Sequence, residues 1–264
     1  ELRQSTFGYT NLQAPSITDG WDYNRMEWIE LTANADNFRL EGPNLGLELG
    51  SLSGKERFTG LQITKFETVL RFSPEALELK NLDLRTEKSQ IKNYLLLEPK
   101  GPKGYGDFIN QVQLTLGFKE TVLDPSDIRR FAPTLPAIED AFNLSGELKG
   151  TLSDLTTDEF LVRMGKKTAL FGSFQIDGLP QLDSTFIRLD LKNSVISAND
   201  LSPYLNSEAQ KELNKFNTIR FDADLTGMLH RFTTNGSFRT NIGNLNGRID
   251  YESKEKLSTI TSRL

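Results

Sequence analysis

Apolar and polar residues alternate strictly from Phe142 to Ser153, within the stretch FNLSGELKGTLSDL of residues 142–155. One parity carries only polar side chains, and the other holds apolar residues or glycine: Phe142, Leu144, Gly146, Leu148, Gly150 and Leu152. A period of two places successive side chains on opposite faces of a β-strand. Apolar residues three and four apart, as a helix requires, are missing. The stretch therefore predicts a strand with one apolar and one polar face.

The same pattern returns 77 residues later. Its apolar parity is Ile219, Phe221, Ala223, Leu225, Gly227 and Leu229, and its polar parity includes Arg220, Asp222, Asp224 and Thr226. Recurrence at this spacing is typical of a repeat architecture. Each copy exposes one apolar face, so stacked copies would form a continuous apolar surface.

Two further alternating motifs recur. One has a small or polar central residue, at Asn93, Gly172 and Gly247, which would let a strand bend or approach another backbone closely. The other has an apolar residue at every second position, at residues 112–116 and again at 187–191. Before them, the parity of the leucines switches at Lys80-Asn81, which predicts a bulge or a tight turn.

Short helices are predicted after the second of these motifs. Asp124 before Pro125 has the form of an N-cap followed by a first helical residue. The pattern is repeated around Asp200, which lies 73 residues after Asp127. A further amphipathic helix is predicted for 207–216.

These motifs divide the chain as follows. Residues 1–27 are expected to be an irregular segment and 253–264 a polar, frayed tail. Between them we expect a divergent first β repeat at 28–107, a second at 108–183 and a third at 184–252.

Composition narrows the functional classes. The 264 residues carry 31 basic and 36 acidic side chains, a net charge of −5, which argues against nucleic acid as the main partner. Cysteine is missing, which removes disulfide and thiolate chemistry. The chain begins at Glu1, without a recognisable signal peptide or an apolar run long enough to span a bilayer. We expect a processed chain or the middle section of a longer protein.

Residues suited to catalysis or metal binding are few. His230 is the one histidine, and we interpret it as a surface residue. Asp222 and Asp224 share a strand face, as glycosidase carboxylates can, and equally as any solvated face does. We predict no catalytic residues, no metal and no cofactor, and we interpret the carboxylates near the short helices (Asp124, Asp127 and Asp200, with Asn199) as caps rather than as a Ca²⁺ site.

Two smaller features have ordinary structural interpretations. The aromatic cluster Trp21, Tyr23 and Trp28 predicts packing at one end of the sheet, with sugar stacking as the functional alternative. Lys166-Lys167 predicts a basic turn.

The repeated segments resemble the TamB family of the AsmA-like superfamily, the translocation and assembly module subunits of Gram-negative envelopes. The resemblance is carried by residues 142–155, 167–191 and 217–238. The order of motifs is typical of these proteins: a strand that ends in G-T-L-S-D-L, then G-S-F-Q-I-D-G-L-P, then an Asp-Leu helix entry. It covers most of 28–252 and consists of patterning without a catalytic signature.

The resemblance implies a periplasmic protein anchored in the inner membrane, working with an outer-membrane barrel partner. The anchor and the partner-binding domain would lie outside these residues. It also implies a mainly β fold, an elongated U-shaped antiparallel sheet with an apolar groove and a few short helices. Bridge-like lipid-transfer proteins are similar in architecture, and acyl chains are thought to travel along their grooves.

We therefore expect a non-enzymatic envelope segment that carries phospholipid between the two membranes, or assists outer-membrane protein assembly, or does both. The expected groove-lining residues are Leu144, Leu148, Leu152, Leu170, Phe174, Ile176, Leu189, Leu191, Phe221, Leu225, Leu245 and Ile249. The alternative is a closed-core β module acting as a structural, adhesin or carbohydrate-binding segment. A β-helix enzyme, which would depend on acidic pairs such as Asp222 and Asp224, is a third alternative.

Overall fold

The structure is a computed structural model. It describes the chain except for residues 14, 15, 17–19, 23, 102, 103, 132, 134–136, 206, 229, 255, 256 and 264, and it describes 208, 209, 253, 254 and 257–263 by backbone alone. Tyr23 and Leu229 of the sequence patterns therefore lie outside the described residues.

The chain divides into two compact units. Unit 1 consists of Glu1–Pro99 and Thr115–Phe142, and unit 2 of Lys100–Leu114 and Asn143–Leu264. Unit 1 holds the following elements, of which β7 begins in unit 2: β1 (Leu2–Thr10), β2 (Arg25–Glu41), β3 (Asn44–Glu56), β4 (Gln62–Ser73), β5 (Ala76–Thr86), β6 (Gln90–Pro99), β7 (Val112–Leu123) and α2 (Pro125–Arg129).

Unit 2 contains the later strands and the remaining short helices. Its strands are β8 (Phe142–Thr151, whose first residue belongs to unit 1), β9 (Asp154–Met164), β10 (Thr168–Asp177), β11 (Phe186–Ser197), β12 (Thr218–Met228), β13 (Arg231–Thr240), β14 (Gly243–Lys254) and β15 (Leu257–Arg263). Its helices are η1 (Gly104–Asp107), α1 (Phe108–Gln111), η2 (Leu182–Ser184), α3 (Ala198–Leu201), η3 (Ser202–Tyr204) and α4 (Ser207–Asn214).

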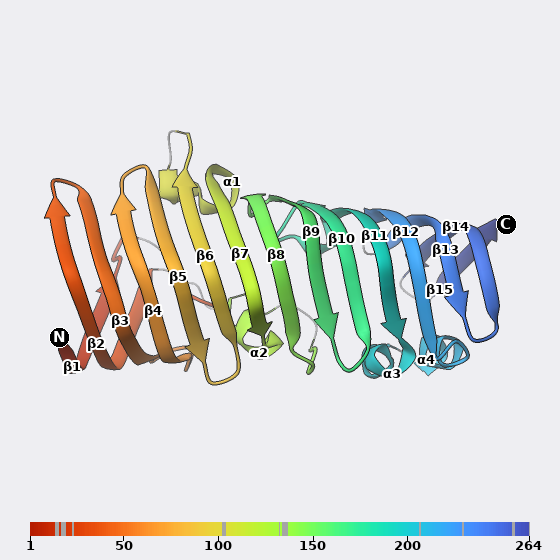
Figure 1. The fold of residues 1–264 in the computed structure, drawn as a ribbon, viewed down its shortest axis with the longest axis horizontal. Coiled ribbons are helices and arrows are strands. Elements are labelled where there is room, and N and C mark those ends of the chain that lie inside the picture. The colour runs from red at the N-terminus through yellow and green to blue at the C-terminus, as the bar shows by residue number, and fades with distance from the viewer. Residues whose placement is uncertain are drawn as a thin grey trace. The chain divides into compact units, whose positions relative to one another are not determined.

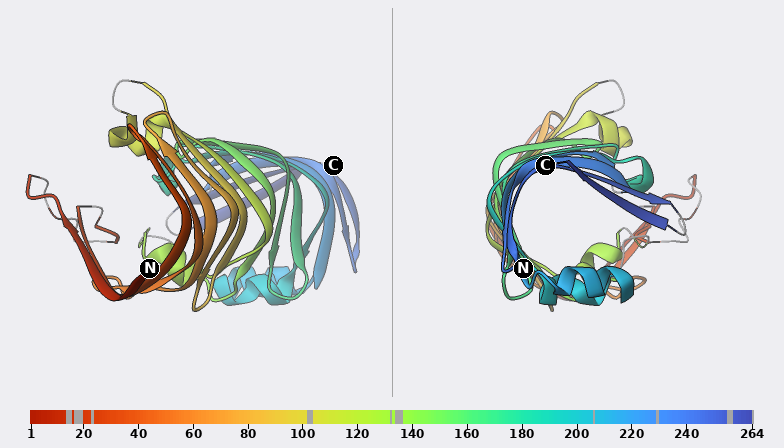
Figure 2. Two further views of the ribbon diagram at one scale, coloured as in Figure 1. Left: turned by 60° about the vertical axis from the view of Figure 1, so that its left-hand side comes forward. Right: turned by 90° about the vertical axis from the view of Figure 1, so that its right-hand side faces the viewer.

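Each unit is an antiparallel sheet whose strands follow one another in chain order. Successive strands pair from β1 to β6 in unit 1 and from β9 to β15 in unit 2. The short helices lie at the ends of the strands (Figure 1). The strands bend along their length, so that each unit by itself is a U-shaped sheet (Figure 2). The predicted mainly β, antiparallel fold with a few short helices is confirmed.

Bulges account for part of this bending. The parity switch predicted at Lys80-Asn81 is a bulge, because the register between β5 and β6 shifts between Lys80 and Leu82 and Asn81 has a φ of +53°. β11 shifts register against β12 between Leu191 and Ser194, with Asn193 at φ +49°. An extra residue at such a point bends and twists the strand.

The short helices α2 and α3 are each held to a β-hairpin by an aspartate side chain. In unit 1, Asp124 caps α2 by accepting from the Ser126 N–H at 2.9 Å, and Asp127 accepts from the Thr86 and Ser89 hydroxyls, both at 2.6 Å. In unit 2, 73 residues later, Asp200 accepts from the Lys166, Lys167 and Thr168 N–H groups at 3.1, 2.8 and 2.8 Å. Each helix is thereby held against a β-hairpin turn.

Two predictions about the chain ends are wrong. Residues 1–27 were predicted to be irregular, but Leu2–Thr10 forms β1, and the predicted frayed tail contains the end of β14 and β15. β1 pairs with β2 through its backbone while nearly all its side chains stay exposed. A strand that buries neither face leaves no alternation in the sequence.

The predicted strand over residues 142–155 is too long. β8 ends at Thr151, and a turn at Leu152-Ser153 leads into β9, which already contains Leu155. The Thr151 and Ser153 hydroxyls are 3.0 Å apart, and the Ser153 N–H donates to the Ile109 carbonyl oxygen at 3.1 Å. These polar contacts hold the turn where alternation alone predicts continuation.

Candidate functional site

The apolar parity of the unit 2 strands forms registered rows across the sheet. One row runs through six successive strands, from β9 to β14: Thr157, Phe174, Leu189, Leu225, Thr234 and Ile249. A second runs through the same strands: Leu155, Ile176, Ile187, Gly227, Phe232 and Tyr251. Residues directly opposite each other in a ladder share a face. We call this surface the apolar face of unit 2.

Nine of the twelve predicted groove residues lie on this face. They are Leu170, Phe174, Ile176, Leu189, Leu191, Phe221, Leu225, Leu245 and Ile249. Leu144 and Leu148 lie on β8 with half-buried side chains, and Leu152 lies in the turn after it.

The apolar face is only partly covered. Leu191 and Phe221 are buried at 5% and 7% exposure and form a small cluster with Ala223. The other ten predicted residues are half buried. In the core of a closed β-sandwich, such side chains interdigitate with a second sheet and are buried on all sides. Within the described residues of unit 2, no second sheet lies over this face.

Two further aromatic residues, Phe160 and Phe238, also line this face. Phe160 packs edge-on against Phe174 at 5.9 Å between ring centroids, and Phe238 stacks on Phe221 at 5.9 Å. Phe238 shares the parity of Phe232 and Thr234 on β13, so alternation contains the signal for it. Phe160 does not share the parity of Leu155 and Thr157, because the register between β9 and β10 shifts between Thr157 and Phe160. The Thr157 hydroxyl, buried on the same face, makes no hydrogen bond in the described part of the chain.

Unit 1 has an apolar face of the same kind, which the sequence analysis did not assign. Two rows cross β3 to β6: Leu45, Phe72, Leu77 and Leu97, and next to them Leu47, Leu70, Leu79 and Leu95. Leu40 is opposite Leu45 at the end of β2 and is 64% exposed, and Phe72 is 37% exposed. The face is therefore open at the β2–β3 end of the strands.

Of the two carboxylates considered for chemistry, Asp222 makes contacts within the fold. Asp222 accepts from the Asn193 N–H at 2.8 Å and lies 3.4 Å from Arg239, while Asp224 is exposed. His230 is exposed, as predicted. Among the described residues, no group of three His, Cys, Asp or Glu side chains is arranged to hold a metal ion.

One polar cluster stands out on unit 1. Hydrogen bonds from Arg85, the largest cause, together with those from Lys65 and Gln90, outweigh the effect of burial and hold the pKa of Asp83 far below its usual range. Arg85 Nε and Lys65 Nζ are each 2.9 Å from its carboxylate oxygens. Both cations are bound to the carboxylate, which makes this a structural ion-pair network.

The aromatic cluster near the N-terminus packs as predicted. Trp21 is 8% exposed and stacks on Phe131 at 4.9 Å, and Trp28 lies 6.2 Å from it. A buried, stacked indole is not available as a platform for a sugar ring.

A scan against protein-family models and searches of curated proteins and of solved structures gave no match to this chain. In the described part of the chain, the helices are too short to span a membrane.

Proposed function

We propose that this chain is a section of a TamB-like envelope protein whose apolar sheet faces hold phospholipid acyl chains. The observation that carries the proposal is the apolar face of unit 2, which extends over six strands in register. Its side chains are mostly half buried, and within the described residues of unit 2 no second sheet covers it. A face of this kind is stabilised when an apolar occupant replaces water.

Elementary energetics supports an acyl chain as that occupant. Removing a methylene group from water contributes about 0.8 kcal/mol. An acyl chain of about 16 carbons therefore gains on the order of 10 kcal/mol before the cost of ordering it. The rows run across the strands, so a chain lying along them would contact several strands. With few polar groups to fix its position, it would be held and still be able to slide.

The wider setting is supported by the family resemblance alone. A periplasmic location, transfer between the inner and outer membranes and a part in outer-membrane protein assembly all belong to the proposal on that basis. No geometric feature of the two units favours the assembly role over lipid passage.

The experiment is native mass spectrometry with lipid extraction on chain purified from a Gram-negative host. We expect phospholipid to co-purify, and we expect Leu148→Asp together with Leu225→Asp to remove it, with the fold retained by circular dichroism. Burying an ionised carboxylate beside an acyl chain is strongly unfavourable. The matched control is Asn143→Asp with Thr226→Asp, which adds the same charges at positions of the polar parity on the same two strands, β8 and β12.

Two results would contradict the proposal. If lipid stays bound to the Leu148 and Leu225 double variant while the fold is intact, the lipid-binding site must lie elsewhere. A lipid-free wild-type chain that unfolds on these substitutions would show that the apolar faces are core, and the function would have to be sought on the polar face.

A further inference from the structure

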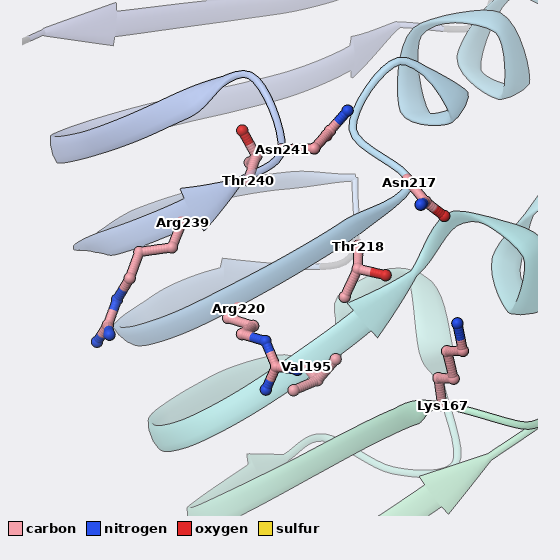
Figure 3. A pocket seen from close by; sticks show the side chains of 8 residues that line it. All are labelled: Lys167, Val195, Asn217, Thr218, Arg220, Arg239, Thr240 and Asn241. Carbon is pink, nitrogen blue, oxygen red and sulfur yellow. The ribbon is translucent and has the colours of Figure 1, made fainter.

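The polar face of unit 2 contains a cavity of about 560 Å³ with an unusual charge. Eight residues line it: Lys167, Val195, Asn217, Thr218, Arg220, Arg239, Thr240 and Asn241 (Figure 3). Three of them are cations and none is an acid, in a chain whose net charge is −5. We call this cavity the basic cavity.

Three other cavities of the described structure have no excess of positive charge in their linings. Arg231 and Arg248 line one together with Asp250 and Glu252. Arg39 and Arg71 line another with Glu41 and Glu78, and Arg25 lines a third with Asp22 and Glu56. Among these four, the excess of positive charge is confined to the basic cavity.

The register places two of the cations directly opposite each other. Arg220 on β12 pairs with Arg239 on β13, and Val195 on β11 pairs with Arg220 on the other side. Like charges directly opposite on neighbouring strands are destabilising. Figure 3 shows Arg220 beside Val195, with Lys167 extending from the β9–β10 turn toward Asn217.

Among the three cations, Arg239 alone has a carboxylate partner in the described structure. Asp222 reaches Arg239 at 3.4 Å, but its other oxygen already accepts from the Asn193 N–H. Asp200, next to Lys167 at the turn, is occupied by three backbone N–H groups and the Thr168 hydroxyl. In the described structure, neither Arg220 nor the Lys167 ammonium group is in an ion pair. A pair of like charges that the fold retains at a cost in stability indicates a candidate functional site.

We propose that the basic cavity binds a phosphate anion, as a phosphomonoester or phosphodiester group. Guanidinium groups bind phosphate oxygens in a bidentate manner, and an ammonium group adds a third charge. One phosphate placed between Arg220 and Arg239 replaces their repulsion with two attractions. Three cations on one small patch suit a single phosphate group, whereas a nucleic acid backbone needs an extended basic surface.

The basic cavity lies on the opposite face from the acyl-chain site, because Arg220 and Arg239 alternate with Phe221 and Phe238 along their strands. The proposal is therefore independent of the proposed function, and either can fail without the other.

The test compares the double variant, in which Arg220→Gln and Arg239→Gln are made together, with the wild type. In phosphate-free buffer, we expect the double variant to melt at a higher temperature because the repulsion is removed. Inorganic phosphate and glycerol 3-phosphate should raise the melting temperature of the wild type and should bind the variant at least about tenfold more weakly by titration calorimetry. High salt should weaken wild-type binding.

The matched control is Lys192→Gln with Arg248→Gln. It removes the same charge from unit 2 at residues paired with Asp190 and Asp250, outside the basic cavity. We expect it to bind phosphate as the wild type does.

A second arm identifies the source of the phosphate. Co-sedimentation with phosphatidylcholine vesicles, with and without phosphatidylglycerol, reports binding to a lipid headgroup. Binding to the anionic vesicles alone supports a headgroup, and binding to the soluble esters as well supports free phosphate compounds. Binding to neither overturns the proposal, as does equal binding by the double variant or a melting temperature that falls in phosphate-free buffer.

Discussion

Single glycines decide how closely neighbouring strands of unit 2 can approach. Gly172 lies at the centre of β10 with a φ of +154°, opposite Leu191. A Cβ atom added there would clash with the Asp190 carbonyl oxygen and would lie 3.0 Å from the Leu191 Cα. The small residue at the centre of this motif is therefore a requirement of the backbone, and the predicted close approach is found.

Gly172→Ala should accordingly destabilise the chain by about 1–3 kcal/mol, because both the backbone conformation and the space favour glycine. Chemical denaturation of the two proteins measures this. Gly8→Ala is the control, since a Cβ atom at Gly8 would have no other atom within 4 Å and the φ of Gly8 lies outside the left-handed region. Equal stability of the Gly172 variant and the wild type would show that the strands can separate locally without cost.

Residue-scale patterns in the sequence predicted the apolar face better than the polar one. Alternation placed Leu189, Leu225 and Ile249 on one face without any knowledge of their neighbours. The conflict between Arg220 and Arg239 could not be predicted in the same way. It depends on which residues lie opposite each other, and that register is set by bulges and turns that the hydrophobic pattern does not specify.

Among the elements, the short helices depend on buried carboxylates. Asp200 is 7% exposed, and burial is the largest single effect on its pKa and raises it. The hydrogen bonds from Lys166, Lys167 and Thr168 together outweigh burial, so the pKa of Asp200 lies below its ordinary value. The ionised form is thus the one that holds α3 against the β9–β10 hairpin.

Asp200→Asn should therefore lower stability at pH 7, by about 1–3 kcal/mol, since it leaves backbone donors without a charged acceptor. An unfolded aspartate titrates near pH 3.9. Because the folded pKa is depressed, the contribution of Asp200 is present above that pH and is lost as the pH falls through the folded pKa. The difference between variant and wild type should shrink on going from pH 7 to pH 3.

Thermal melts at both pH values measure this difference. Asp177→Asn is the control, because Asp177 is exposed on β10 and its side chain makes no hydrogen bond among the described residues. A gap between the Asp200 variant and the wild type that stays constant with pH would mean that shape, and not charge, holds the helix.

The sequence indicated that these helices exist but not what fastens them. Asp124 has a recognisable cap spacing, and it caps α2. Asp127 accepts hydrogen bonds from Thr86 and Ser89, which precede it by 41 and 38 residues. No local pattern reports a contact over that separation. The offset of 73 residues between Asp127 and Asp200 was visible, and the structure explains it as one anchoring device used twice.

At the scale of the whole molecule, each unit is stabilised more by strand pairing than by a deep core. The buried apolar side chains are few, and the apolar faces are half open. Strands with neighbours on both sides, such as β4 and β12, should open only with large parts of their unit. β1 pairs with β2 alone and has almost no buried side chains, so it should open locally at little cost.

Hydrogen exchange followed by mass spectrometry measures this directly on the full chain. We expect amides of β1 to exchange orders of magnitude faster than those of β4, which has β3 and β5 as neighbours in the same unit. Protection of β1 that disappears on dilution would mean that a second copy pairs with its free edge. Protection that is independent of concentration would contradict the prediction, and it would mean that β1 is held by more than its pairing with β2.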